Sequence, residues 1–473
     1  MTGQATVSLQ LDPRRLHTLI QREERALDNA TQRSAELYRR GRQALSGGVA
    51  SSFQVRRPWP IYLAGGRGPA VWDVDGHRRL DFHNGFGAMV HGHAHPVIGR
   101  VVRERYARGT HFAAPTEDAI VVGEELARRW GLPRWRYTNS GSESTMDAIR
   151  IARGFTGREV VLKAIGSYHG HHDAVLAPGI TGPDHVGGAA SAPAGGPAAP
   201  AGGAAAPGAG GIPAAVARLT VAVPFNDAEA MERAIACLDR QGSKPACVIL
   251  EPAMMLGMIL PEPGYLEAVR EITRRHGVVL IFDEVKTGLA IGAAGATGRY
   301  GVRPDLVTLA KALGAGMPCG AVGGSEDVMS VVEDGSVHQV GTFNGNALAM
   351  AAARASLLEV LTPGAYQHLE RLSQRMTGGC QRTLDRHGLP GYALGTGARG
   401  CVTLAASRIT DHVTFQAAQN PELSRLIWLY YMNRGVFATP ARPEQWTLSI
   451  AHAEAEVDAY LAVHAALLAE LAP

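Results

Sequence analysis

The residues best suited to chemistry are a lysine and an acid that follow two short apolar runs. Lys311 comes directly after DLVTLA (305–310), and Asp283 lies near the end of VVLIFDE (278–284). Such runs predict buried strands of a parallel sheet, whose carboxyl ends open into a ligand-binding crevice. A lysine buried there loses its proton more easily and can attack a carbonyl as a free amine. A lysine that extends from a strand end into water would fit the position of Lys311 equally well.

Asp283 strengthens the chemical interpretation of Lys311. The two residues are 28 positions apart, so their strands can be neighbours joined by a crossover. An aldehyde cofactor such as pyridoxal 5'-phosphate (PLP) needs both an amine and a carboxylate, because a protonated pyridine nitrogen makes its ring an electron sink. We therefore predict that Lys311 holds PLP as a Schiff base and that Asp283 faces the pyridine nitrogen. A metal-binding or helix-capping role for Asp283 is the alternative.

Two turns of small residues could bind the phosphate of such a cofactor. Ser140, Gly141 and Ser142 run directly into an amphipathic pattern, and amide groups at a helix start bind anions together with nearby hydroxyls. The second turn, GTFNGN (341–346), offers the hydroxyl of Thr342. Tyr168 follows another apolar run and could stack on a planar ring. Ordinary N-capping by the serines and ordinary packing of Tyr168 remain open.

The elements that must position these residues form an alternating pattern. Short apolar runs at 160–164, 246–251, 278–284 and 305–310 are separated by helical patterns, which predicts βαβ units and an α/β fold with a largely parallel sheet. Residues 12–46 read as one helix that Asp12 caps, and 70–82 read as a hairpin with a primed turn at Asp75-Gly76. After about residue 355, long helices separated by short strands predict a smaller α+β domain, with a last helix from about 453.

Composition narrows the class of partner. The chain has 473 residues, 46% of them hydrophobic, and a net charge of +3 without a dense basic run, so a small molecule is a better partner than nucleic acid. Five widely spaced cysteines without a CxxC predict a reducing cytoplasm. The sequence has no uninterrupted run of about 18 apolar residues, so we predict no membrane-spanning helix. Between 187 and 215 nearly every residue is Ala, Gly or Pro, which predicts a flexible surface insertion.

Two further motifs invite other interpretations. GTGARG (395–400) fits a dinucleotide-binding pattern, but a strand-like run follows it where that site needs a helix. The histidines at 91–95 and 169–172 could suggest zinc, but the glycines and prolines around them predict loops, and PLP chemistry needs no metal. We predict neither a dinucleotide site nor a metal site.

Several motifs together resemble the class III aminotransferases of PLP fold type I, especially the branch that contains glutamate-1-semialdehyde aminomutase. The similarity extends from about residue 35 to the C-terminus. The motifs that carry it are GGV (47–49), WDVDG (72–76), GHAHP (92–96), NSGSEST (139–145), YHGHHD (168–173), EP (251–252), FDEVKTG (282–288), the Lys311 segment and GTFNGN. The resemblance implies a large domain with a mostly parallel seven-stranded sheet and a small domain built from both chain ends. We expect these domains at 76–350 (large), and at 1–75 and 351–473 (arm and small domain).

The resemblance also implies roles for individual residues. Lys311 would be the Schiff-base lysine and proton carrier, and Asp283 the partner of the pyridine nitrogen. Tyr168 and Val285 would pack on opposite faces of the ring. Gly141 and Ser142 would hold the phosphate, and Thr342 would reach the phosphate of a partner subunit. An obligate homodimer with composite active sites follows.

The reaction is less defined by these motifs. The mutase branch has an arginine for the substrate carboxylate where this chain has Gln54, but Glu444 falls where that branch has a substrate-site glutamate. The cations that could replace the missing arginine are Arg56, Arg57, Arg399 and Arg442. We therefore favour a ping-pong aminotransferase acting on an amino donor and a keto or aldehyde acceptor. An intramolecular 2,1-aminomutase is the alternative, and a non-catalytic binding homologue a more distant one.

Overall fold

The computed structural model describes residues 12–176, 180–181, 210–440 and 445–472, and these form two compact units. Unit 1 comprises the described parts of Met1–Pro96, Gln367–Arg408 and Ala417–Pro473, and unit 2 comprises those of Val97–Tyr366 and Ile409–Gln416. The sequence places the divisions after residues 75 and 350, which is 21 and 16 residues before those of the two units. Asn84 explains the first difference, because its side chain donates to the carbonyl of Thr447 within unit 1. Tyr366 explains the second, because its hydroxyl donates to the carbonyl of Leu289 within unit 2.

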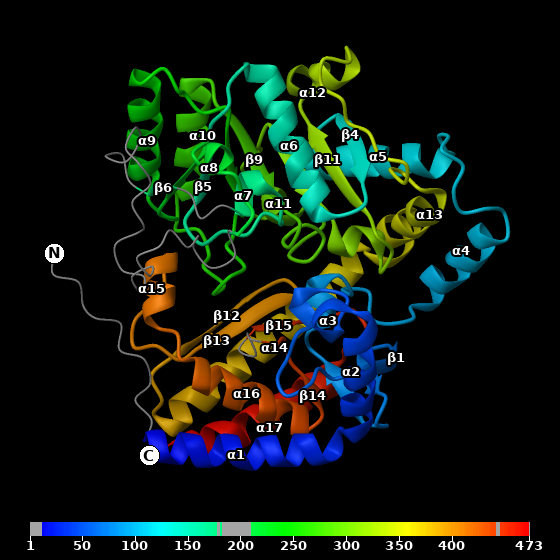
Figure 1. Ribbon diagram of the computed structural model, residues 1–473, viewed down its shortest axis with the longest axis vertical. Coiled ribbons are helices and arrows are strands. Elements are labelled where there is room, and N and C mark those ends of the chain that lie inside the picture. Colours follow the sequence, from blue (N-terminus) through cyan, green and yellow to red (C-terminus); the bar gives the residue numbers. More distant parts are fainter. Residues whose placement is uncertain (1–11, 177–179, 182–209, 441–444, 473) are drawn as a thin grey trace. The chain divides into compact units, whose positions relative to one another are not determined.

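Unit 2 is built on one sheet of eight strands in the order β4-β11-β10-β9-β8-β5-β7-β6 (Figure 1). Only β11 runs antiparallel to its neighbours, β4 and β10. The predicted mostly parallel sheet of seven strands is thus confirmed, with the two-residue β6 added at one edge. The strands are β4 (Arg134–Thr138), β5 (Val161–Ala164), β6 (Ile180–Thr181), β7 (Thr220–Val223), β8 (Cys247–Leu250), β9 (Val279–Asp283), β10 (Leu306–Leu309) and β11 (Gly320–Gly324).

The four apolar runs identified in the sequence are all strands, namely β5, β8, β9 and β10. β11 escaped prediction because its sequence, GAVGG, has a low intrinsic preference for a strand. Its glycines make room for larger neighbours, since a Cβ atom on Gly323 would lie 2.5 Å from the ring of Trp135. Tertiary packing therefore decides the conformation of this segment.

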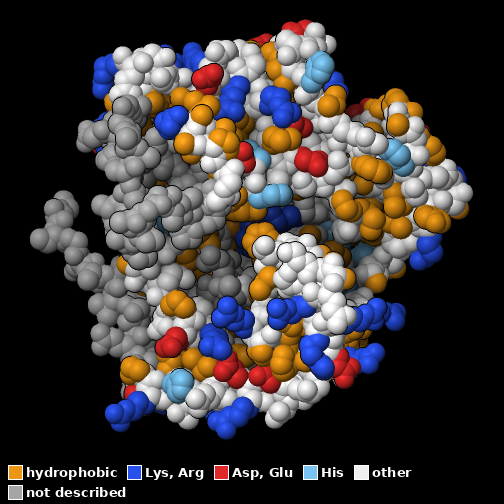
Figure 2. Space-filling model, viewed as in Figure 1, with side chains coloured by type: hydrophobic (Ala, Val, Ile, Leu, Met, Phe, Trp, Pro, Cys, Tyr) orange, Lys and Arg blue, Asp and Glu red, His pale blue; other side chains and the backbone are white. Residues whose placement is uncertain are grey.

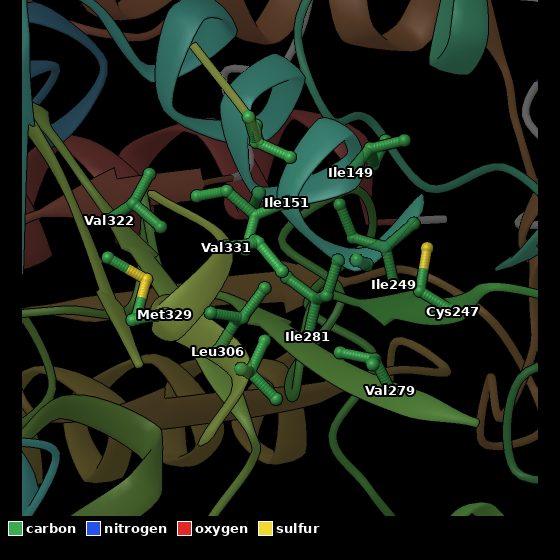
Figure 3. Packing of buried hydrophobic residues seen from close by; sticks show 14 of the residues in the cluster. Ile149, Ile151, Cys247, Ile249, Val279, Ile281, Leu306, Val322, Met329 and Val331 are labelled. Atoms are coloured by element: carbon green, nitrogen blue, oxygen red, sulfur yellow. The ribbon is translucent and has the colours of Figure 1, made fainter. Parts of the chain in front are cut away.

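One long helix, α6 (Gly141–Thr156), lies on the centre of the sheet and contacts β4, β8, β9, β10 and β11. Figure 3 shows Ile149 and Ile151 of α6 packed above Ile249, Ile281 and Leu306 of the strands. Burying each such side chain contributes about 1.5–3 kcal/mol. This cluster fixes the start of α6 relative to the strand ends.

Unit 2 contains further helices besides α6. They are α4 (Pro96–Tyr106), α5 (Glu117–Trp130), α7 (Asp173–Leu176), α8 (Ala214–Ala217), α9 (Ala228–Arg240), α10 (Tyr265–His276), α11 (Gly295–Tyr300), α12 (Glu326–Glu333), α13 (Ala347–Ala355) and most of α15 (His412–Ala417), with the short turns η4 (Lys311–Gly314) and η5 (Ser356–Val360). Among these, α5 packs on α13, α9 on α10, and α12 on α6.

Unit 1 has two small antiparallel-rich sheets, of order β1-β2-β3-β14 and β12-β13-β15. Their strands are β1 (Leu63–Arg67), β2 (Ala70–Asp73), β3 (Arg78–Asp81), β12 (Tyr392–Thr396), β13 (Arg399–Thr403), β14 (Val436–Phe437) and β15 (Gln445–Thr447). The helices are α1 (Pro13–Ala30), α2 (Gln32–Ala44), α3 (Asn84–Gly87), α14 (Pro363–His387), which starts in unit 2, α16 (Pro421–Asn433) and α17 (Glu454–Leu471), with η1 (Ser46–Gly48) and η2 (Ser52–Gln54). Both chain ends contribute, which confirms the predicted small α+β domain.

Two local predictions for unit 1 need correction. The hairpin of β2 and β3 is present, but three residues separate the paired Asp73 and His77, with Gly76 at φ +92°, instead of a two-residue primed turn. The predicted single helix over 12–46 is two helices that meet at Thr31. The carboxylate of Asp75 accepts the amide hydrogens of Arg33 and Ser34, so the hairpin turn caps a new helix start.

GTGARG is the turn of the β12–β13 hairpin, so no helix follows it. The Ala/Gly/Pro insertion lies largely outside the described residues. No helix in the described part of the chain is long and apolar enough to cross a membrane.

Candidate active site

Lys311 stands at the carboxyl edge of the sheet of unit 2. β9 and β10 pair in parallel with Asp283 opposite Thr308, and η4 begins at Lys311 two residues after β10 ends. The backbone of Lys311 has φ +50°, a left-handed conformation that costs a non-glycine residue about 1–2 kcal/mol. Strain of this kind gathers at functional sites, where the surrounding fold enforces it.

The other lysines of the chain are worse placed for such a role. There are four in all, and Lys163 is buried in β5, where its ammonium donates to the carbonyl of Val175 at 2.7 Å. Lys244 forms an ion pair with Asp239 at 2.8 Å. Lys286 follows the end of β9 and is the one rival of Lys311 at the sheet edge.

Asp283 is buried, with 4% of its surface exposed, and its carboxylate is held in one orientation. One oxygen accepts the amide hydrogen of Val285 at 3.0 Å and contacts the hydroxyl of Thr308 at 3.2 Å. The other oxygen lies 2.7 Å from Nδ1 of His169. Because donors on three segments fix this carboxylate, Asp283 can present a negative charge in a defined direction.

His169 is the main functional candidate that the sequence did not identify. It lies in one of the histidine groups considered for zinc, but its ring contacts Asp283 and is fully buried. Within the described ranges, no group of three or more His, Cys, Asp or Glu side chains could hold a metal ion. Nothing in the local pattern YHGHHD distinguishes a carboxylate partner from a metal ligand, because Asp283 is 114 residues away.

The turn at the start of α6 meets the other site residues. Ser140 caps the helix by accepting the amide hydrogen of Glu143 at 3.2 Å. The Ser142 hydroxyl lies 3.0 Å from Nδ1 of His171. A Cβ atom on Gly141 would lie 2.7 Å from the side chain of Val285, so this turn and the segment after Asp283 touch. The amides of the first turn of a sixteen-residue helix can bind an anion here.

Tyr168 is held beside the same turn by its backbone. Its amide donates to Glu251 at 3.0 Å, and Glu251 also accepts the amide hydrogen of Met255 at 3.2 Å. Glu251 is buried, so it anchors the loop at the end of β8. Burial and, after it, the charge of Asp283 raise the pKa of the Tyr168 hydroxyl. Gly170, at φ +101°, lets this loop pass close to Ser142.

Thr342 lies on an exposed turn of unit 2. This turn is tied to the α6 turn, because the Asn139 side chain donates to the side-chain oxygen of Asn344 at 3.1 Å. Thr342 is thus exposed at the surface of unit 2, and its contact with a second chain stays a prediction.

Burial also perturbs acid–base groups in this region. It lowers the pKa of His172 to about 4, with like charges adding to the effect, so this imidazole is neutral near pH 7. It raises the pKa of Glu284, the acid next to Asp283, although Thr297 and Trp130 donate hydrogen bonds to its carboxylate. The Glu284 carboxylate therefore binds donors of α11 and α5, and we do not count it among the site residues.

The expected substrate residues that the structure describes belong to unit 1. Gln54 is exposed, and its side-chain oxygen accepts the amide hydrogen of Ala50 at 3.1 Å. Arg399 is buried in β13 and donates to the hydroxyl of Thr447. Glu444 and Arg442 lie outside the described residues.

Arg56 is held by contacts within unit 1. Its guanidinium carbon lies 3.9 Å from the ring centre of Trp428, and it donates to the carbonyl of Trp59 at 3.1 Å. Burial lowers the pKa of Arg56 to about 10. A role for Arg56 as the carboxylate cation stays a prediction, and these contacts show only how its side chain is held within unit 1.

The described side chains of unit 2 match the parts of PLP. An amine at the start of η4 and a buried carboxylate at the end of β9 stand at the same edge of the sheet. An anion-binding helix start touches the segment of Val285. An aromatic side chain, Tyr168, lies on the adjoining loop. The contacts Gly141–Val285, Ser142–His171 and His169–Asp283 join the helix start, the Tyr168 loop and the carboxylate into one cluster. The arrangement fits a planar aldehyde cofactor with a phosphate group.

Comparison with known proteins gives consistent results. The model of the family described as aminotransferase class-III matches residues 53–420. The glutamate-1-semialdehyde 2,1-aminomutase of Desulforudis audaxviator is 36% identical to this chain over 432 residues, which cover 90% of this chain and 95% of that protein.

Solved structures of similar proteins include both kinds of reaction. A glutamate-1-semialdehyde-aminomutase from Pseudomonas aeruginosa PAO1 is 31% identical, with a TM-score of 0.86 over 98% of this chain and 100% of that one. A second structure of that enzyme is a complex with PMP. An omega-transaminase from Sphaerobacter thermophilus is 34% identical, with a TM-score of 0.82 over 93% of this chain and 97% of that one.

Proposed function

We propose, from the premise that this chain belongs to the class-III aminotransferase family, that it is a PLP-dependent enzyme that moves an amino group on a small molecule. The observation that carries this proposal is the placement of Asp283 at the end of β9 and of Lys311 just after the neighbouring strand β10, at the same edge of the sheet. When bound, PLP supplies an electron sink for the carbon next to the transferred nitrogen.

Each residue of the cluster has a proposed part in this chemistry. Lys311 would attach the cofactor through its amine and then carry a proton to and from the reacting carbon of the substrate. Asp283, held by His169, would keep the pyridine nitrogen protonated. Ser140, Gly141 and Ser142 would bind the phosphate. Tyr168 and Val285 would enclose the ring, which excludes water and fixes its orientation.

For the reaction itself, we propose an intramolecular amino transfer of the 2,1-aminomutase type. The curated relative named above carries this activity in its name, and it is 36% identical over 90% of this chain. This reverses the order that the sequence motifs suggest. The two-substrate aminotransferase remains the second candidate, because Gln54 stands where the mutase branch has its arginine, and because an omega-transaminase is structurally similar.

A single-turnover experiment separates the two reactions. The purified protein, saturated with PLP, is mixed with common amino donors, and conversion to pyridoxamine phosphate and release of a keto acid are followed. Keto acid release supports the aminotransferase, whereas isomerisation of an aminoaldehyde without a second substrate supports the mutase. A protein that does not acquire visible absorbance with PLP would contradict both and favour a binding homologue.

We further propose that the enzyme is a homodimer that pairs through an apolar patch, defined here as Tyr106, Phe112, Val340 and Phe343. Their exposed fractions are 74%, 50%, 80% and 55%. Large apolar side chains that gather on an exposed surface mark an interaction site, whereas single ones are ordinary. Val340 and Phe343 flank Thr342 in the sequence. The ring centre of His111, the residue before Phe112, lies 4.6 Å from that of Phe343, so the two segments of the patch meet near Thr342. Figure 2 shows hydrophobic side chains gathered over α4, α5 and α13.

A charge placed on the patch tests the dimer. Val340→Asp should shift the protein from dimer to monomer in sedimentation and weaken PLP binding, because Thr342 would no longer reach a second site. Val413→Asp, at another exposed apolar position of unit 2, is the matched control and should remain dimeric. A Val340→Asp protein that stays dimeric would disprove this interface.

The expected compartment is the cytoplasm. Among the described residues the cysteines form no disulfide, and four of the five are buried, which supports a reducing environment. No disulfide contributes to the proposed site.

A further inference from the structure

A buried serine on α6 joins the anion-binding turn to the strand that carries Lys311. The Ser144 hydroxyl lies 3.1 Å from the carbonyl oxygen of Leu309, the last residue of β10, and 3.0 Å from that of Ser140. Ser144 has no exposed surface. One side chain therefore touches both the N-cap of the helix and the backbone two residues before Lys311.

A second hydroxyl completes this cluster but does not reach β10. Thr138, at the end of β4, lies 2.7 Å from the Ser144 hydroxyl and 3.1 Å from the carbonyl of Ser140. Each hydroxyl has a single hydrogen to donate. Thr138 can donate to Ser140, which leaves the hydrogen of Ser144 for Leu309. The link to the Lys311 strand thus depends on Ser144 and not on Thr138.

The neighbouring strand provides the space for both hydroxyls. A Cβ atom on Gly320 of β11 would lie 2.4 Å from the Thr138 hydroxyl and 2.5 Å from that of Ser144. These separations are far below van der Waals contact, so a larger residue could not coexist with the cluster. The two hydroxyls of Thr138 and Ser144 therefore require a glycine at position 320 of β11.

We propose that Ser144 is a positioning residue that sets the separation between the phosphate-binding turn and Lys311. This inference rests on the proposed function, in which one cofactor is held at both ends. A molecule bonded to Lys311 and bound through its phosphate spans a fixed length, so a small displacement of either anchor weakens both. Ser144 ties the two anchors directly, without touching the cofactor.

The test compares Ser144→Ala with Thr138→Val in the full-length protein. Each substitution removes one hydroxyl from the same buried cluster, but only Ser144→Ala removes the contact with Leu309. The measurements are the dissociation constant of PLP from an absorbance titration, the pH midpoint of the absorbance change of the bound cofactor, and the thermal unfolding of the PLP-free protein.

We expect Ser144→Ala to raise the dissociation constant about tenfold, the effect of losing one good hydrogen bond, and to shift the pH midpoint. Thr138→Val should change the dissociation constant less than about twofold, while both variants unfold at similarly lowered temperatures. Ser144→Cys keeps a weak donor, so its dissociation constant should lie between those of Ser144→Ala and the unchanged protein. If the alanine variant does not fold, the cysteine variant is compared with Thr138→Val instead.

Equal effects of the two substitutions on the dissociation constant and the pH midpoint would overturn the proposal and leave the cluster a purely structural one. Failure of the proposed function is recognised separately. In that case the unchanged protein would itself show no visible absorbance with PLP and no cofactor fixed to Lys311 after borohydride treatment.

Discussion

Nδ1 of His169 lies 2.7 Å from a carboxylate oxygen of Asp283, and both side chains are buried at the edge of the central sheet. Val285 and Thr308 contact the other oxygen, so the imidazole completes the set of partners of this carboxylate. A hydrogen bond to a charged group contributes about 1.5–3 kcal/mol. His169 therefore helps to hold the orientation of the Asp283 carboxylate.

Substitution of His169 should separate the lost hydrogen bond from the lost ring. In His169→Asn, the amide nitrogen can take the place of Nδ1, whereas His169→Leu leaves Asp283 without this donor. We expect His169→Leu to lower the rate of amino transfer at least tenfold and to weaken PLP binding, and His169→Asn to retain most of both. Stopped-flow absorbance of the bound cofactor measures the rate. If the leucine variant matched the unchanged protein, Asp283 would not need His169.

The choice of lysine can be tested directly. We expect Lys311→Ala to abolish attachment of PLP that survives borohydride reduction, because the attacking amine is gone. Lys286→Ala, which removes the other lysine near the sheet edge, should keep that attachment. Mass spectrometry of the reduced protein reports it, and a cofactor still fixed to the Lys311→Ala protein would show that another lysine is used.

Gly320→Ala should destabilise unit 2, because its Cβ would overlap the hydroxyls of Thr138 and Ser144. Overpacking of this kind costs about 1–3 kcal/mol. The midpoint of urea unfolding measures the loss. Gly65→Ala is the matched control, because a Cβ atom there would meet nothing within 4 Å. Equal midpoints for the two variants would mean that β11 can move away from the cluster.

Acid should destabilise the protein partly through His464. Burial lowers the pKa of this histidine to about 4, against an ordinary value of 6.5. Between these two values the unfolded chain binds more protons than the folded one, so the free energy of unfolding falls as the pH drops from 6.5 to 4. The loss from this one group is up to about 3 kcal/mol.

His464→Gln removes the titrating group but can still accept the hydrogen bond of Tyr431, which lies 2.8 Å from Nδ1. We expect this variant to show a flatter dependence of unfolding free energy on pH between 4 and 6.5. Substituting the exposed His17 in the same way should leave the slope unchanged. An unaltered slope in His464→Gln would show that this histidine titrates normally in the folded protein.

The sequence by itself determined the strands that carry the chemistry. Uninterrupted apolar runs can be stable only when buried, so β5, β8, β9 and β10 were recognisable, and with them the edge where Lys311 and Asp283 stand. Asp12 and Pro13 marked the start of α1 for an equally local reason, since Asp12 caps that helix.

Only the tertiary structure decided which distant groups meet. His169 and Asp283 are 114 residues apart, and Ser144 and Leu309 are 165 apart, so their contacts depend on the order of the strands rather than on any local pattern. The same holds for β11, whose glycines favour a strand only because Trp135 and two hydroxyls fill the space beside them. Asp75 likewise breaks the predicted N-terminal helix by capping it from the hairpin. A side chain's partner is set by packing, and packing is a property of the whole fold.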